Sequence, residues 1–171
     1  MDENIQASHY SRIHDEYGAH YYDEASTKYR EEFIYSRLFQ DIDLNNKEIA
    51  DLACGVGVVS QAILARYPLA KTTGFDISTK ACEAYKTNLS RPGFQIDLTI
   101  PMRIETQYDA VVILGGLHHC VVDLPTTLEN ISNLIKPGGS FLLVEPNAEF
   151  FLEGIRKLWY QYDNYFESSS E

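Results

Sequence analysis

Apolar runs and amphipathic stretches alternate along most of this 171-residue chain. Short apolar or alternating runs predict strands at 48–54, 71–77, 94–98, 108–114 and 140–145. Helical spacing of the apolar positions predicts helices near 57–67, 79–89, 123–135 and 147–166. The runs at 110–114 and 141–144 are almost continuously apolar, which is typical of strands buried on both faces. Strands that alternate with helices indicate right-handed crossovers, and so a doubly wound, mostly parallel α/β sheet with helices on both faces.

The first 46 residues have a different pattern. They are rich in Tyr and contain two predicted helices, near 6–22 and 26–40. Phe33, Ile34, Arg37 and Leu38 lie at helical spacing on the second of these. We therefore expect an N-terminal helical segment, residues 1–46, followed by an α/β core, residues 47–171.

The most informative stretch is 48–57, where a short strand ends in a glycine turn and a helix follows. Glycine lets the backbone approach a ligand closely, and the free N–H groups of the first helical turn face that ligand. We therefore predict that Gly55 and Gly57 cradle an anion or nucleotide, in preference to making only a tight turn. Asp51 lies inside the strand, where a buried acid needs partners. We expect its carboxylate to accept N–H groups from the glycine turn, with simple exposure as the alternative.

Polar side chains also follow the other predicted strands. Asp76 ends the second strand and lies 19 residues after Gly57, close to the spacing at which an acid binds a ribose diol. The alternative is that Asp76 caps the next helix, a role that Ser78 can already fill. Asp97 follows the third strand and is either a site residue or a solvated loop acid. His118 and His119 follow the fourth strand on the same expected edge of the sheet.

Composition narrows the range of partners. The formal net charge of −11 disfavours nucleic-acid binding and anionic membranes, and its simplest meaning is solubility. No apolar run is long enough for a membrane span and no signal peptide is visible, so we expect a cytoplasmic protein. Cys54, Cys82 and Cys120 are odd in number and lie in apolar contexts, which indicates buried thiols instead of disulfides or a metal site.

Four segments in order resemble motifs of the class I S-adenosylmethionine-dependent methyltransferases. They are Asp51–Gly57, Gly74–Ser78, Tyr108–His119 and Leu134–Glu145, and the resemblance covers roughly residues 46–147. The Lys-Pro-Gly-Gly of residues 136–139 before an apolar strand is the most discriminating of them. The resemblance implies a Rossmann-like core that binds S-adenosylmethionine and releases S-adenosylhomocysteine.

The resemblance also implies a role for individual residues. The backbone around Ala53, Gly55 and Gly57 would face the methionine part, and Asp76 would hold the ribose hydroxyls. Ile77 would pack on adenine, Asp97 would accept its amino group with Leu98 beside it, and Leu114 and Gly115 would pass under the sulfonium. In many members an N-terminal helical segment closes over the cofactor, which would place Tyr10, Tyr17 and Tyr22 near the sulfonium. The alternative for each tyrosine is amphipathic packing.

Two features depart from the family pattern. Ala53 stands where many members have glycine, and we expect its small side chain to be tolerated. The chain ends about one helix after the fifth predicted strand, whereas the family usually adds a sixth strand and an antiparallel seventh. We therefore expect C-terminal strands to be missing, through truncation or completion of the sheet by a partner. An uncovered edge would also favour homo-oligomerisation.

Methyl transfer from a sulfonium depends mainly on holding the acceptor in line, and a general base adds about 10²–10⁴-fold. His119 is our first choice for that base and His118 the second, with packing or helix capping as the alternative for either. No third ligand lies near this pair, so we predict no metal. The Leu-His-His motif favours a small-molecule acceptor, with a sugar or natural-product hydroxyl first and an amine second. The alternatives are a cofactor-binding scaffold and an NAD-dependent oxidoreductase. The oxidoreductase is disfavoured because Ser60 stands where the dinucleotide fingerprint needs Gly or Ala.

Overall fold

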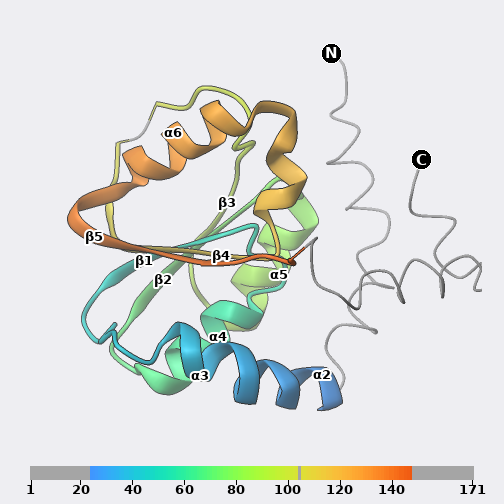
Figure 1. Ribbon diagram of the computed structural model, residues 1–171, viewed down its shortest axis with the longest axis vertical. Helices are drawn as coiled ribbons and strands as arrows, with labels where there is room; N and C mark the ends of the chain where they lie inside the picture. The colour runs from blue at the N-terminus through green and yellow to red at the C-terminus, as the bar shows by residue number, and fades with distance from the viewer. Residues whose placement is uncertain (1–23, 104, 148–171) are drawn as a thin grey trace, which may run out of the picture.

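One five-stranded parallel sheet organises the computed structural model, which describes residues 24–103 and 105–147 (Figure 1). The strand order is β3-β2-β1-β4-β5, and all four neighbouring pairs are parallel. The strands are β1 (Glu48–Leu52), β2 (Lys71–Asp76), β3 (Gly93–Gln95), β4 (Tyr108–Leu114) and β5 (Ile135–Val144). All five predicted strands are therefore confirmed, and so is the doubly wound α/β class. The order reverses between β1 and β4, which is the switch point where such sheets bind ligands.

The helices follow the predicted alternation. They are α2 (Glu24–Tyr29), the π-helical turn η1 (Arg30–Tyr35), α3 (Ser36–Leu38), α4 (Val58–Arg66), α5 (Thr79–Leu89), the 3₁₀ helix η2 (Leu117–Asp123) and α6 (Leu124–Leu134). Ser78 caps α5 by accepting Ala81 N–H at 3.4 Å, and Asp123 caps α6 by accepting Thr126 N–H at 3.0 Å. The predicted helices at 6–22 and 147–166 lie outside the described residues. None of the described helices is long and apolar enough to cross a bilayer.

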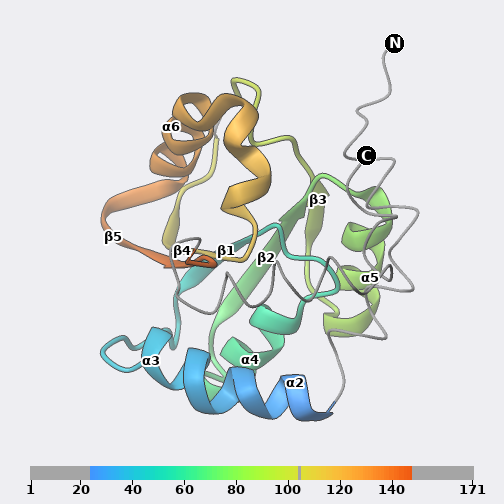
Figure 2. The ribbon, with the colours of Figure 1, turned by 45° about the vertical axis from the view of Figure 1, so that its right-hand side comes forward.

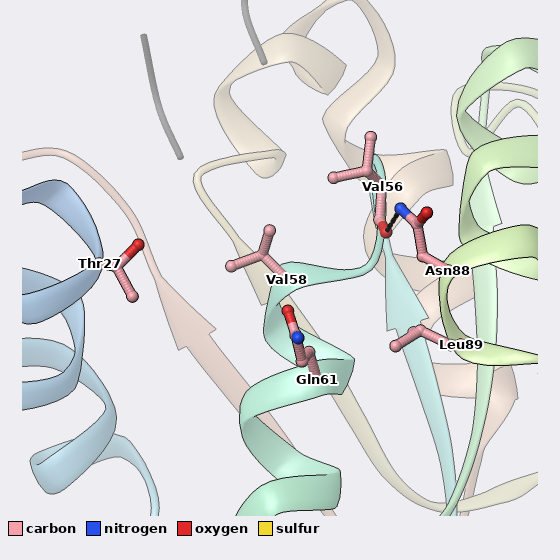
Figure 3. A pocket seen from close by; sticks show the side chains of 6 residues that line it. All are labelled: Thr27, Val56, Val58, Gln61, Asn88 and Leu89. Atoms are coloured by element: carbon pink, nitrogen blue, oxygen red, sulfur yellow. Dashed lines mark hydrogen bonds between the residues drawn. The ribbon is translucent and has the colours of Figure 1, made fainter. Parts of the chain in front are cut away.

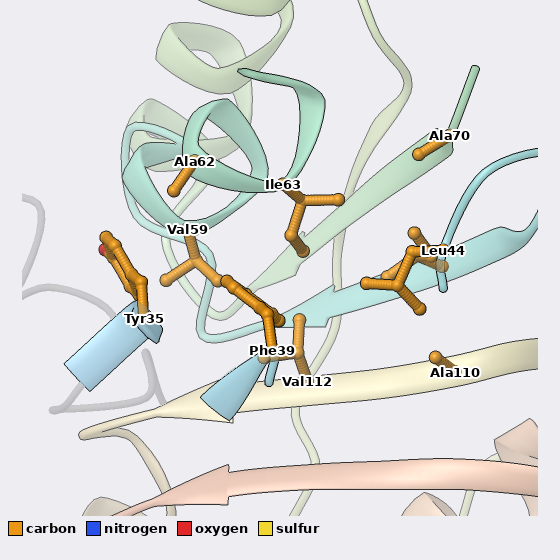
Figure 4. Packing of buried hydrophobic residues seen from close by; sticks show 10 residues of the cluster. Tyr35, Phe39, Leu44, Val59, Ala62, Ile63, Ala70, Ala110 and Val112 are labelled. Carbon is orange, nitrogen blue, oxygen red and sulfur yellow. The ribbon is translucent and has the colours of Figure 1, made fainter. Parts of the chain in front are cut away.

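Helices cover both faces of the sheet, with α6 on one side and α2, α3 and α4 on the other (Figures 1 and 2). On the α4 face, the helical run 24–38 and α4 share one buried core with β1 and β4 (Figure 4). Its members are Tyr35, Phe39, Leu44, Ile49, Val59, Ala62, Ile63, Ala70, Ala110 and Val112. The α6 face has a second core built from Ala50, Leu52, Leu98, Tyr108, Val111, Ile113, Ile131 and Leu134. The alternation of Ala110 and Val112 with Val111 and Ile113 shows why β4 reads as a continuous apolar run.

The N-terminal helical run packs one apolar face against the core. Ile34 and Leu38, two of the positions at helical spacing, pack beside the buried Tyr35 and Phe39, whereas Phe33 remains 49% exposed. The run includes a π-helical turn at 30–35. Arg66 of α4 fixes this run to the core, because its guanidinium binds the Glu31 carboxylate and lies 5.7 Å from the ring centroids of Tyr35 and Phe39.

The expectation that residues 141–144 are buried on both faces is wrong. Phe141 is 37% exposed and Leu143 is 41% exposed. The reason is position, since β5 is the outermost strand of the described sheet next to β4. The three cysteines are free; Cys54 and Cys82 are buried as expected, whereas Cys120 is half-buried.

Candidate active site

The predicted site segments meet at the carboxyl edge of the sheet, beside the switch point between β1 and β4. The glycine turn follows β1, Asp76 ends β2 and Gly115 follows β4. Gly55 N–H donates to Asp76 Oδ2 at 2.9 Å, which joins the first two segments directly. Gly115 N–H donates to the Val144 carbonyl at 2.8 Å, which joins the end of β4 to that of β5. The prediction that these residues converge on one edge is therefore confirmed.

Left-handed backbone shapes the turn after β1. The φ angles are 50° at Ala53, 52° at Gly55 and 94° at Gly57. A Cβ on Gly57 would lie 2.6 Å from Leu89 Cδ1 of α5, and its φ of 94° is strained for any residue with a side chain. At Gly115 (φ 66°), by contrast, a Cβ would have no heavy atom of the described residues within 4 Å. The space beside Gly115 is therefore open on the side where a ligand is expected.

Asp51 lies fully buried beneath this turn, and its partner differs from the one expected. Its Oδ2 accepts Ser60 Oγ–H at 2.7 Å and Ser60 N–H at 3.2 Å, in the first turn of α4, instead of N–H groups of the glycine turn. The Ser60 hydroxyl also lies 2.6 Å from the Tyr85 hydroxyl of α5. Burial raises the pKa of Asp51 to about 7, although the Ser60 hydrogen bonds oppose the shift. The acid thus ties β1 to α4 directly and, through the Ser60 hydroxyl, to α5.

Asp76 uses both carboxylate oxygens to hold backbone. Oδ1 accepts Ser78 N–H at 2.9 Å, and Oδ2 accepts Gly55 N–H at 2.9 Å. Ser78, not Asp76, caps α5 through its side chain. The adjacent Ile77 is held through its carbonyl, which accepts Gln95 Nε2–H at 2.9 Å. Asp76 therefore joins the end of β2 to the turn after β1 and to the start of α5.

The loop after β3 carries Asp97 and the buried Leu98. Asp97 Oδ1 accepts Thr99 N–H at 2.9 Å and Thr99 Oγ1–H at 2.7 Å, which shapes the loop as a tight turn. Asn130 of α6 then holds this loop from below. Its Nδ2 donates to the carbonyls of Leu98 at 2.9 Å and Ile100 at 2.8 Å. Asn130 is not among the predicted site residues. In the sequence it is a polar side chain on the apolar face of an amphipathic helix, which is the pattern that could have indicated its role.

His118 and His119 lie on η2, with their ring centroids 3.9 Å apart. His118 Nδ1 lies 2.6 Å from Glu145 Oε2, and Leu117 N–H donates to Glu145 Oε1 at 2.7 Å. Glu145 directly follows β5, so it reaches the rim from the neighbouring strand end. In the sequence, Glu145 is only the last residue of the Leu134–Glu145 motif. Because it follows a parallel strand, it lies on the same edge of the sheet as the other candidates.

A cavity of about 420 Å³ adjoins the glycine turn (Figure 3). It is lined by Thr27 of α2, Val56 of the turn, Val58 and Gln61 of α4, and Asn88 and Leu89 of α5. Asn88 Nδ2 donates to the Val56 carbonyl at 3.1 Å, so α5 supports the turn from this side. Among the predicted site residues that the structure describes, none lines this cavity. Tyr17, with Tyr10 and Tyr22, lies outside the described residues, and its predicted contact with the cofactor stays a prediction.

Fold and site together define a Rossmann-like nucleotide-cofactor protein with its ligand edge at the β1–β4 switch point. Residues 50–141 match the family described as "Methyltransferase domain", which is more than half of the chain. The chain therefore belongs to this family, the class I S-adenosylmethionine-dependent methyltransferases. The predicted family and its cofactor, S-adenosylmethionine, are confirmed.

Curated relatives carry the name ubiquinone biosynthesis O-methyltransferase. The protein from Nitrosomonas europaea is 28% identical over 144 residues, 74% of this chain and 60% of the relative. The protein from Dechloromonas aromatica is 27% identical over 148 residues, 76% of this chain and 62% of the relative. The chain thus spans about three-fifths of the length of these relatives.

Solved structures share the fold. The structure described as "DhpI-SAM-HEP complex" superposes with a TM-score of 0.65 at 24% identity, covering 94% of this chain and 71% of that one. The PH0226 protein from Pyrococcus horikoshii has a TM-score of 0.58 at 20% identity, covering 70% of this chain and 57% of that one. These likenesses confirm the Rossmann-like methyltransferase fold.

Proposed function

We propose that this chain is the cofactor-binding core of a methyltransferase that transfers a methyl group from S-adenosylmethionine to a hydroxyl group of a small molecule. The observation that carries the proposal is the 2.9 Å hydrogen bond from Gly55 N–H to the Asp76 carboxylate. It brings together the two segments that would bind the methionine and ribose parts of one ligand. The names of the curated relatives support a hydroxyl acceptor over an amine.

Each remaining site residue has a proposed role at this edge. Ala53, Gly55 and Gly57 present turn backbone to the methionine part, and Asp51 supports that turn from below through Ser60. Asp76 accepts the ribose hydroxyls and Ile77 packs on adenine, whose amino group Asp97 accepts with Leu98 beside it. Leu114 and Gly115 leave room for the sulfonium end, in agreement with the open space at Gly115.

The bound cofactor supplies a methyl group on a positively charged sulfur. The chain's own residues bind that cofactor, align the acceptor oxygen with the methyl carbon and exclude water, because orientation dominates such a displacement. An imidazole of the His118–His119 pair takes the hydroxyl proton. The alternative of an NAD-dependent oxidoreductase is removed by the family match. The second candidate is a scaffold that keeps the cofactor site without turnover.

Calorimetry with S-adenosylhomocysteine tests the cofactor site. Asp76→Ala should weaken binding about tenfold or more, since hydrogen bonds to a charged group contribute about 1.5–3 kcal/mol. Glu83→Ala is the matched control, because Glu83 is an exposed acid on the neighbouring helix α5. Equal affinities for the wild type and Asp76→Ala would contradict the ribose assignment.

Transfer is tested with methyl-labelled S-adenosylmethionine and a panel of phenols, sugars and amines. Label on a hydroxyl acceptor supports the proposal, and label only on amines overturns the hydroxyl assignment. Tight cofactor binding without transfer to any acceptor favours the scaffold.

A further inference from the structure

We propose that Glu145 is the positioning residue for the base, and that it holds His118 in the tautomer whose Nε2 can accept the substrate proton. This inference rests on the proposed function and deepens it. Of the two candidate bases, it concerns His118, whose Nδ1 lies 2.6 Å from Glu145 Oε2.

The geometry comes from two adjacent strand ends. Leu114 at the end of β4 is in register with Val144 at the end of β5, and Glu145 is the next residue. The two carboxylate oxygens of Glu145 contact different groups. Oε1 lies 2.7 Å from Leu117 N, and Oε2 lies 2.6 Å from His118 Nδ1. The Glu145 side chain is 20% exposed and the His118 side chain 45% exposed, so the acid is the more enclosed partner. A carboxylate held at two points in this way fixes the orientation of the imidazole.

The chemistry follows from what a carboxylate can do. An ionised carboxylate only accepts hydrogen bonds, so His118 Nδ1 must carry a proton and donate it to Glu145. In the neutral ring, Nε2 is then unprotonated and can accept a proton. This is the nitrogen that a general base needs, on a side chain that is 45% exposed.

The proposed step balances in atoms and charge. The acceptor oxygen bonds to the methyl carbon, the methyl–sulfur bond breaks, and its electron pair stays on sulfur to leave a neutral thioether. The hydroxyl proton passes to His118 Nε2, and the resulting imidazolium is stabilised by the Glu145 carboxylate. Loss of that proton to water restores the base.

A purely structural role for Glu145 is the competing explanation, since Leu117 N–H also depends on it. Glu145→Gln separates the two roles. The amide oxygen can still accept Leu117 N–H, whereas the amide NH₂ facing His118 can only donate. The ring must then accept at Nδ1 and carry its proton on Nε2. The variant therefore keeps the backbone contact and reverses the tautomer.

The first measurement needs no substrate and does not depend on the proposed function. Long-range ¹H–¹⁵N NMR of the full chain, at a pH where the ring is neutral, reports which nitrogen of His118 carries the proton. We expect Nδ1–H in the wild type, Nε2–H in Glu145→Gln, and equal urea unfolding midpoints. Nε2–H in the wild type, or no change in the variant, overturns the proposal. Glu129→Gln, an exposed acid on α6, is the control and should leave the tautomer unchanged.

The second measurement is turnover on an accepted hydroxyl substrate. Glu145→Gln should lower kcat about 10²-fold or more with KM and S-adenosylhomocysteine affinity unchanged, as expected for a base held in the wrong tautomer. In a His118→Ala background the same substitution should have no further effect, because the two residues act as one unit. A reversed tautomer with full turnover overturns the positioning role and leaves the proposed function standing. If the wild type methylates no acceptor, the proposed function fails, and the catalytic role of Glu145 fails with it.

Discussion

At the carboxyl end of the sheet, acidic side chains hold turns, whereas at the amino end an acidic side chain holds strands together. Asp76 accepts N–H groups from Gly55 and Ser78, both in turns beside the candidate site. Asp109, near the start of β4, accepts Glu48 N–H of β1 at 2.8 Å and pairs with Lys136 Nζ of β5 at 3.1 Å. The same residue type therefore shapes a ligand edge at one end and fastens three strands at the other.

Gly139 at the amino end and Gly115 at the carboxyl end differ in what surrounds them. A Cβ on Gly139 would lie 2.9 Å from the Asp109 carbonyl oxygen and 2.8 Å from Ile135 Cγ2, so packing requires glycine there. Around Gly115 the described residues leave the space open. The Lys-Pro-Gly-Gly motif, the most discriminating feature of the family resemblance, thus lies at the end of the sheet away from the site. Its role in this structure is to let β5 bulge past Asp109, where the register with β4 shifts.

The largest effect we expect is a pH-dependent stability difference between the wild type and Asp51→Asn. Burial raises the folded-state pKa of Asp51 to about 7. Between the unfolded value of about 3.9 and that pKa, the folded chain retains a proton that the unfolded chain has lost. The free energy of unfolding of the wild type should therefore fall relative to the variant as pH rises from about 4 to about 7, by up to roughly 4 kcal/mol. Urea unfolding across this range measures the difference.

Asp109→Asn is the matched control at the amino end. For this variant, the stability difference from the wild type should change with pH in the opposite direction. The hydrogen bond from Glu48 N–H, and then the Lys136 ammonium, hold the pKa of Asp109 below its ordinary value. Its contribution is fully present above the unfolded pKa of about 3.9 and is lost as pH falls through the lower folded value. The wild type should therefore be more stable than this variant near neutral pH, and the difference in unfolding free energy should disappear only as the pH falls below about 4. If the stability differences of Asp51→Asn and Asp109→Asn from the wild type changed with pH in the same direction, the contrast between the two ends would be contradicted.

The second prediction concerns packing against the β5 bulge. Gly139→Ala should destabilise the chain by about 2 kcal/mol, because the added methyl group meets backbone oxygens that cannot move independently of the bulge. Thermal and urea unfolding measure the loss. Gly138→Ala is the control: its φ of 79° adds strain, but its Cβ would meet no described atom within 4 Å. It should cost only about 1 kcal/mol.

Gly115→Ala extends this comparison to the carboxyl end. Its φ is 66°, and open space surrounds the added Cβ among the described residues, so the stability cost should again be about 1 kcal/mol. Affinity for S-adenosylhomocysteine should fall here and not in Gly139→Ala. If Gly139→Ala weakens cofactor binding as much as Gly115→Ala, the two ends are not functionally distinct.

Local patterns were sufficient to predict the sheet and the strand ends at which the cofactor candidates lie. The continuous apolar run of β4 reflects its place between β1 and β5, with cores on both faces. The Ser78 cap was visible because capping depends only on residues within one helical turn. The carboxyl edge of the sheet was correctly predicted for Asp76, because the carboxyl ends of all strands in a parallel sheet lie at the same edge.

Contacts between distant segments could not be predicted in the same way. The pairing of His118 with Glu145 joins residues 27 apart and depends on β4 and β5 being neighbours in register, which local spacing does not specify. The sequence predicts that Asp51 accepts N–H groups of the adjacent glycine turn. In the structure, α4 begins at Val58 and places Ser60 N–H within hydrogen-bond distance of Asp51 instead. The π-helical turn at 30–35 has no 3.6-residue signature in the sequence.

The smallest effect we predict concerns left-handed backbone at the two ends. Ala53 follows β1 with a φ of 50°, and Ser90 precedes β3, at the amino end, with a φ of 52°. Such conformations cost an L residue roughly 1–2 kcal/mol, part of which is offset by the greater chain entropy that glycine loses on folding. Ala53→Gly and Ser90→Gly should therefore each stabilise the chain by about 0.5 kcal/mol in urea unfolding.

Cofactor affinity separates these two variants. Ala53 lies in the turn proposed to face the methionine part, so Ala53→Gly adds flexibility there and should weaken S-adenosylhomocysteine binding slightly, whereas Ser90→Gly should not. A gain in stability at Ser90 without one at Ala53 would show that strain in the turn is relieved by other contacts. An equal change in affinity in both variants would show that backbone freedom at the amino end also affects cofactor binding, which would contradict a functional difference between the two ends.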